Sequence, residues 1–142
     1  MILLFRGRGI SRGKATGQLL VSPAPISFLS GVDPDTGIIV EKGHPLDGES
    51  ITGRVLAFSH GKGSTVGSYV LYALARNGKA PAAIINGRAD PIIAVGAIMG
   101  KIPMVDEPEV GIIRLRNGAF ATVDGSSGEI EYEGELLPEP GG

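Results

Sequence analysis

Apolar positions change their spacing along this chain, and each change predicts a different kind of element. Between residues 2 and 56, short apolar runs are interrupted by Gly and Pro about every eight to twelve residues, a spacing typical of strands joined by turns. We predict strands over residues 2–5, 18–21 and 37–40. The first third of the chain therefore consists of strands and turns.

The middle of the chain mixes short apolar runs with helical spacing. Residues 54–58, 81–85 and 102–105 are continuous apolar runs, which predict three buried strands. Between the first two, apolar residues follow the i, i+3, i+4, i+7, i+8 spacing of one helix face, at Val66, Tyr69, Val70, Ala73 and Leu74.

Capping residues mark the ends of the predicted helices. Ser64 or Thr65 supplies the N-cap of the first helix, and Asn77-Gly78 supplies a left-handed stop. Asp90-Pro91 combines an N-cap with proline at the first helical position, and this predicts a second helix over residues 92–99, apolar on almost every side.

The tail returns to hairpins, with runs at residues 111–116, 119–123 and 129–132 separated by Asn-Gly and Asp-Gly turns. We expect residues 137–142 to be frayed and residues 1–142 to form one domain. The predicted fold class is α/β: a βαβαβ core with helices over parallel strands, flanked on both sides by antiparallel strands. Ligands in such folds collect at the carboxyl ends of the parallel strands, which directs attention to residues 60–65.

Composition excludes several classes of function. Lys and Arg number 13 against 15 Asp and Glu, and a net charge of -2 argues against nucleic-acid or membrane partners. The absence of Cys excludes disulfides, a thiol nucleophile, a Cys-ligated zinc site and an iron-sulfur cluster ligated by this chain alone. The longest apolar stretch is far short of the ~20 residues needed to span a bilayer, and no signal-peptide pattern is present, so we expect a cytoplasmic protein.

The segment of residues 61–65 has the parts of an anion or oxyanion site. Gly61 and Gly63 let the backbone come close to a ligand, the following helix begins with free N–H groups, and Lys62 adds a positive charge. The intervening Gly63 excludes a Walker A loop, and the spacing differs from the G-x-G-x-x-G dinucleotide motif. The pattern is equally compatible with Ser64 acting only as a helix cap.

Other candidate residues favour simpler interpretations. The basic stretch of residues 6–13 resembles a phosphate-binding loop, but the pattern favours a solvated turn. His44 and His60 have no nearby acidic pair, so we predict no metal site and interpret each as a turn or surface residue.

A group of sequence blocks identifies this chain as similar to the small subunit of the aconitase X family. The blocks keep their order from about residue 7 to about residue 125. They are Pro25-Ile26-Ser27-Phe28, residues 31–37 (GVDPDTG), residues 44–48 (HPLDG), residues 61–71 (GKGSTVGSYVL), Ala89-Asp90, Gly96-Ala97-Ile98 and residues 102–106 (IPMVD).

The resemblance implies the swivelling β/β/α domain of an aconitase, separated from a large subunit that holds a 4Fe-4S cluster. It implies a hydro-lyase that acts on a small anionic hydroxy acid as a heterodimer. We expect dehydration of (R)-5-phosphomevalonate to trans-anhydromevalonate 5-phosphate in the archaeal-type mevalonate pathway of isoprenoid biosynthesis. The alternative substrate in this family is cis-3-hydroxy-L-proline. A chain without Cys is consistent with the cluster lying on a partner.

The family's catalytic serine, a proton acceptor, corresponds to Ser64. The resemblance implies that Ser64 removes a proton from the carbon next to the substrate carboxylate while the partner's cluster acts as a Lewis acid on the leaving hydroxyl. Lys62 and the amides of Gly63 and Thr65 would then hold an anionic group of the substrate. Arg88 is a second candidate anion contact, although its position also suits an ordinary surface arginine.

Two further classes of function remain open at this point. A non-catalytic module could hold a phosphorylated metabolite on the glycine-rich segment, without a partner. A phosphohistidine-carrying swivel domain would use His60, because the same β/β/α fold also serves phosphoryl transfer.

Overall fold

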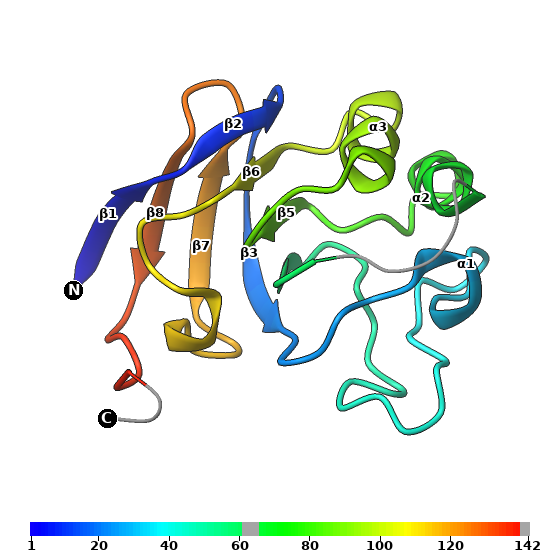
Figure 1. Ribbon diagram of the computed structural model, residues 1–142, viewed down its shortest axis with the longest axis horizontal. Helices are drawn as coiled ribbons and strands as arrows, with labels where there is room; N and C mark the ends of the chain where they lie inside the picture. Colours follow the sequence, from blue (N-terminus) through cyan, green and yellow to red (C-terminus); the bar gives the residue numbers. More distant parts are fainter. Residues whose placement is uncertain (61–65, 140–142) are drawn as a thin grey trace.

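The computed structural model describes residues 1–60 and 66–139. Parallel strands form the centre of its sheet (Figure 1). The strand order is β1-β8-β7-β3-β4-β5-β6-β2 within this described part. Adjacent pairs from β3 to β6 run parallel. The parallel strands are β3 (Lys14–Val21), β4 (Val55–Phe58), β5 (Ala83–Asn86) and β6 (Met104–Asp106).

Antiparallel strands flank this centre on both sides, as the sequence predicts. They are β1 (Ile2–Arg6), β2 (Arg8–Ser11), β7 (Phe120–Asp124) and β8 (Glu129–Glu133). Strand β1 pairs with β8 and β2 pairs with β6, so the two ends of the strand order are joined through Gly7 alone. The sheet therefore closes on itself in the manner of a barrel.

Helices cover the outer face of the parallel strands (Figure 1), and they are α1 (Phe28–Gly31), α2 (Val66–Arg76) and α3 (Pro91–Met99). Helix α3 begins as predicted: Oδ1 of Asp90 accepts a hydrogen bond from the amide of Ile93 at 2.9 Å, and proline opens the first turn. Gly96 lets α3 approach α2 closely, because a Cβ there would lie 3.1 Å from Cα of Ser68.

Alternation along the parallel strands builds two apolar cores. Leu19 points into the closed sheet and Leu20 points toward the helices, and β4 alternates in the same way. The inner core also includes Phe5, Val105, Ala121, Val123 and Tyr132, whereas Phe28, Leu71, Leu74, Ile93 and Ala97 belong to the helix-side core. Strands buried on both faces explain the continuous apolar runs of the sequence.

Two predicted strands are wrong. Residues 37–40 make only isolated bridges, Val32 with Ile39 and Ile38 with Ser50. The long connection from β3 to β4 thus contains no named strand and instead carries the short helix α1.

Residues 111–116 contain the 3-10 helix η1 (Ile112–Arg114) in place of the predicted hairpin strand. Both edges of β7 are already occupied, by β3 and β8, so no place remains for another strand. The Asn117-Gly118 turn meets β3 instead, because Oδ1 of Asn117 accepts from the amide of Val21 at 3.0 Å.

Candidate functional site

A cleft of about 660 Å³ opens at the carboxyl ends of β4 and β5, where the fold class predicts a ligand site. Helix α3 begins at the cleft, and chain order brings the start of α2 a few residues after His60. Both helix N-termini carry partial positive charge, which favours anions. The cleft is lined by Ser59, His60, Gly87, Arg88, Ala89, Asp90 and Pro91.

Backbone hydrogen bonds hold the β5–α3 loop that forms one wall of the cleft. The amide of Gly87 donates to the carbonyl of Phe58 at 3.1 Å, and that of Arg88 donates to the carbonyl of Ser59 at 3.0 Å. The carbonyl of Gly87 accepts from the amide of Glu107 at 3.0 Å. The loop is therefore attached to β4 on one side and to the end of β6 on the other.

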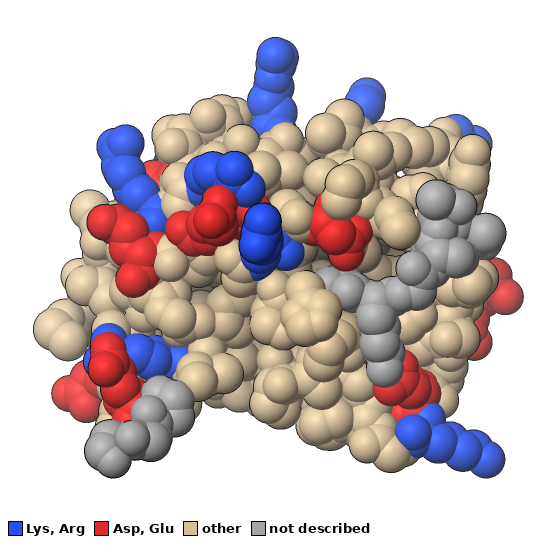
Figure 2. Space-filling view, viewed as in Figure 1, with Lys and Arg blue, Asp and Glu red and all other residues tan. Residues whose placement is uncertain are grey.

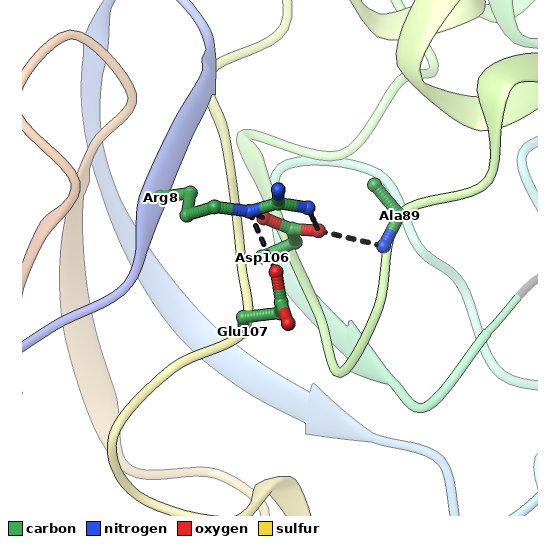
Figure 3. Close-up of polar contacts among 4 residues, drawn as sticks. All are labelled: Arg8, Ala89, Asp106 and Glu107. Carbon is green, nitrogen blue, oxygen red and sulfur yellow. Dashed lines mark hydrogen bonds and ion pairs between the residues drawn. The ribbon is translucent and has the colours of Figure 1, made fainter.

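A buried carboxylate completes the attachment of this loop (Figure 3). Asp106 ends β6 with no exposed surface, and its Oδ2 accepts from the Ala89 amide at 2.9 Å. Arg8 of β2 binds both carboxylate oxygens, with Nε donating to Oδ1 at 2.9 Å and Nη2 donating to Oδ2 at 2.7 Å. Nε of Arg8 also lies 2.7 Å from Oε2 of Glu107. Such paired contacts fix a guanidinium in orientation as well as position.

The electrostatics of this cluster keep Asp106 ionised. Burial by itself raises the pKa of Asp106. The hydrogen bonds from Arg8 and Ala89, together with the charges of Arg8 and Arg88, outweigh burial and hold this pKa below its ordinary value. Figure 2 shows acidic and basic side chains interleaved in a band across this face, so the surface does not have one sign of charge.

Asn86 ends β5 in register with Phe58 and Asp106, and it is fully buried. Its Nδ2 donates to the carbonyl of Phe58 at 3.1 Å. Its Oδ1 has no hydrogen-bond partner among the described residues. An unpaired buried acceptor lowers the stability of the folded state by about 1–3 kcal/mol. An apolar residue would therefore be more stabilising than Asn86 if this position served packing alone.

The predicted site residues have different outcomes. Arg88 lines the cleft and is exposed. Lys62, Gly63, Ser64 and Thr65 lie outside the described residues.

The two histidines occupy different environments. His60 lines the cleft, with Nδ1 3.2 Å from Oγ of Ser59. His44 is buried far from it in sequence and stabilises a turn: Nδ1 accepts from the Leu46 amide at 3.0 Å, and Nε2 lies 3.0 Å from the carbonyl of Pro25. The described part of the chain has no group of three His, Cys, Asp or Glu that could hold a metal ion.

The basic stretch of residues 6–13 is not the solvated turn predicted from the sequence. It forms β2 and the end of β1, and Arg8 pairs with a buried acid. Sequence reasoning also missed Asn86 and Asp106. Both carry a detectable signal, since each is a polar residue directly after a buried apolar run, at the carboxyl end of a parallel strand.

Comparison with known proteins identifies the family. The family model described as the aconitase X swivel domain matches residues 4–132. The chain belongs to the aconitase X swivel domain family. The fold implied by the sequence blocks is thereby confirmed, and the cleft described above is a feature of a swivel domain.

Curated relatives of this swivel domain share a name. The phosphomevalonate dehydratase small subunit of Methanosarcina acetivorans is 58% identical over 128 residues, which cover 89% of each chain. The phosphomevalonate dehydratase small subunit of Pyrococcus furiosus is 54% identical over 134 residues, covering 93% of this chain and 98% of the relative. These relatives match almost the whole swivel domain.

Solved structures agree with this swivel-domain assignment. The crystal structure of Thermococcus kodakaraensis aconitase X in its holo-form superposes with a TM-score of 0.87 at 49% identity, over 96% of this chain and 99% of that chain. The solution NMR structure of a UPF0107 protein gives 0.83 at 44% identity, over 96% and 100%. No helix in the described ranges combines the length and apolar character required to cross a membrane.

Proposed function

We propose that this chain is the small subunit of a phosphomevalonate dehydratase, a hydro-lyase that converts (R)-5-phosphomevalonate to trans-anhydromevalonate 5-phosphate. The observation that carries the proposal is the high identity to small subunits of that name over nearly the full length of both chains. The cleft at the carboxyl ends of β4 and β5, where helix α3 begins, suits an anionic substrate.

Ser64 is the proposed base. It would accept the proton from the carbon next to the substrate carboxylate; the electrons of that C–H bond form the new double bond as the hydroxyl on the neighbouring carbon leaves. A serine oxygen can act as a base only where its alkoxide is stabilised. Ser64 precedes Val66, the first residue of α2, so the helix N-terminus and the ammonium of Lys62 would provide that stabilisation.

The remaining proposed contacts hold the anionic groups of the substrate. Lys62 and the amides of Gly63 and Thr65 would bind one anionic group. Arg88, on the cleft wall formed by the β5–α3 loop, would bind another. The substrate carries a carboxylate and a phosphate, so two separate cationic contacts match its chemistry.

The chemistry of the cluster belongs to a partner in this proposal. A 4Fe-4S cluster is held by Cys thiolates, and this chain contains no Cys. Its residues therefore do not fit the cluster, and we assign the ligands to the large subunit.

An apolar row on α3 is the proposed contact with that large subunit. Pro91, Val95, Ile98 and Met99 are exposed and follow the i, i+4, i+7, i+8 spacing of one helix face; we call this row the α3 stripe. It begins at Pro91, which also lines the cleft. A partner that completes the chemistry of the cleft must lie against its rim, where it would cover this apolar face.

Reconstitution tests the proposal. We expect the purified chain to show no dehydratase turnover alone. Together with the large subunit it should dehydrate (R)-5-phosphomevalonate, and cis-3-hydroxy-L-proline should remain unchanged. Turnover by the isolated chain, or a preference of the reconstituted complex for the hydroxyproline, would contradict the proposal.

A further inference from the structure

The Arg88 side chain makes no hydrogen bond or ion pair with the described residues, although a buried carboxylate lies close to it. It directly precedes Ala89, whose amide donates to Oδ2 of Asp106 at 2.9 Å. The charge of Arg88 also contributes to lowering the pKa of Asp106. Asp106 therefore attracts the Arg88 guanidinium, and an ion pair between them would draw that guanidinium from the cleft.

Arg8 already engages both carboxylate oxygens of Asp106. Its Nε and Nη2 engage one carboxylate oxygen each, at 2.9 and 2.7 Å, in the bidentate geometry of the strongest Arg–carboxylate pairs. The Ala89 amide takes a further position on Oδ2. Arg8 comes from β2, on the far side of β6 from the cleft wall, and Figure 3 shows its guanidinium lying along the Asp106 carboxylate.

We infer that Arg8 is a positioning residue for substrate binding: by neutralising Asp106 it leaves the Arg88 guanidinium available to the anionic substrate. The inference rests on the proposed function, in which Arg88 contacts that substrate. Arg8 does not touch the substrate in this arrangement. Removing Arg8 lets Arg88 turn to Asp106, so substrate binding weakens while the chemical step on bound substrate continues.

Four variants of the reconstituted complex test this inference with (R)-5-phosphomevalonate as the probe. Arg8→Gln should raise KM about tenfold, the effect of losing one charge-assisted hydrogen bond, with kcat within about threefold of the parent. Asp106→Asn keeps an oxygen for the Ala89 amide but removes the competing charge, so KM should stay within about threefold. The double variant Arg8→Gln/Asp106→Asn should restore the KM that Arg8→Gln alone has lost.

The fourth variant, Arg88→Ala, separates the inference from the proposed function. An unchanged KM for Arg88→Ala would overturn the role of Arg88 in the proposed function. A raised KM for Arg88→Ala together with an unchanged KM for Arg8→Gln would overturn only the inference.

A merely structural role of the Arg8–Asp106 pair predicts a different pattern. Asp106→Asn would then raise KM as much as Arg8→Gln, and the double variant would show no recovery; either result would overturn the inference. Thermal midpoints and gel filtration confirm assembly of each complex. Should Arg8→Gln fail to assemble, Arg8→Met, which keeps the aliphatic stem, has the same expected KM and the same expected recovery with Asp106→Asn.

Discussion

At the scale of single residues, Asp106 connects three segments that are distant in sequence. Its carboxylate receives Arg8 from β2 and the Ala89 amide from the β5–α3 loop, while its backbone continues β6. A buried charge is tolerated only when it is paired and hydrogen-bonded. The arrangement therefore depends on all three segments being present together.

The stability contributed by Asp106 should depend on pH. Its folded-state pKa lies below the ordinary carboxyl value of about 3.9, so its contribution is fully present above that value and is lost as the pH falls through the folded pKa. We expect Asp106→Asn to unfold at a lower temperature than the parent at pH 7, with the gap closing below about pH 4.

Thermal midpoints from pH 7 to pH 2.5 measure this gap, with Asp47→Asn, at an exposed position, as a control for loss of one carboxylate. A gap between Asp106→Asn and the parent that stays constant down to pH 2.5 would contradict the prediction.

Ser64 and its neighbour Thr65 form a matched pair for testing catalysis against capping. Loss of a helix N-cap costs about 1 kcal/mol, whereas loss of the base removes the proton-transfer step. We expect Ser64→Ala to abolish turnover of the complex with little change in melting temperature, and Thr65→Ala to retain most of the rate. A Ser64→Ala complex that turns over within a few-fold of the parent would show that Ser64 is only a cap.

The residue types in a sequence indicate which chemical groups are available, but they do not show which side chains contact each other. Arg88 could be proposed from its place after a predicted strand, and it does line the cleft. The pairing of Arg8 with Asp106 joins residues 98 positions apart. No local pattern contains that information, so the sequence alone favours a solvated turn around Arg8.

At the scale of elements, local patterns predicted the strands and helices that are regular over several residues. The predicted runs at residues 54–58 and 81–85 contain or overlap β4 and β5, and helix α3 begins where Asp90-Pro91 indicates. The error at residues 111–116 has a structural cause. An apolar run becomes a strand only if a neighbouring strand has a free edge, and both edges of β7 are occupied. Residues 37–40 form only isolated bridges, within the connection before β4.

Packing of α3 on α2 should depend on Gly96. A Cβ at this position would lie 3.0 Å from Cδ2 of Leu71 and 3.1 Å from Cα of Ser68, which is closer than ordinary contacts. We expect Gly96→Ala to lower the free energy of unfolding by about 1–3 kcal/mol, because overpacking outweighs the gain in helix propensity.

Gly67→Ala in α2 is the matched control. Its added Cβ would meet Cγ2 of Ile92 at an ordinary 3.6 Å, so we expect a gain of up to about 1 kcal/mol. Denaturant unfolding of both variants measures the difference. Equal stability of the two variants would show that the helices can separate without cost.

At the scale of the whole molecule, the cleft and the α3 stripe lie next to each other on a chain that lacks Cys. In the proposed function, the swivel domain would supply anion-binding groups and an apolar surface, and the large subunit would supply the cluster ligands. Sequence patterns predicted the apolar character of α3, while the alignment of its exposed positions into one row depends on which side packs against α2.

Two exposed valines provide a matched test of assembly. Val95 on the α3 stripe and Val40 in the connection before β4 have nearly equal exposed fractions, 48% and 47%. We expect Val95→Lys to weaken binding of the large subunit at least tenfold, because it would bury a charge, and Val40→Lys to leave the affinity within about twofold. Titration calorimetry measures both. Equal affinities would remove the α3 stripe from the interface.

The closure of the sheet by β1 and β2, which meet at Gly7, has a consequence for biosynthesis. Strand β1 pairs with β8, more than a hundred residues later in the chain. A ribosome adding ~5–20 residues per second needs roughly 5–25 s to reach those partners. During that interval Phe5, which belongs to the inner core, and Leu3, which packs against that core, lack the strands that bury them. The backbone of β1 then remains an open edge for pairing with other chains. Nascent swivel domains should therefore depend on chaperones until β8 has left the exit tunnel.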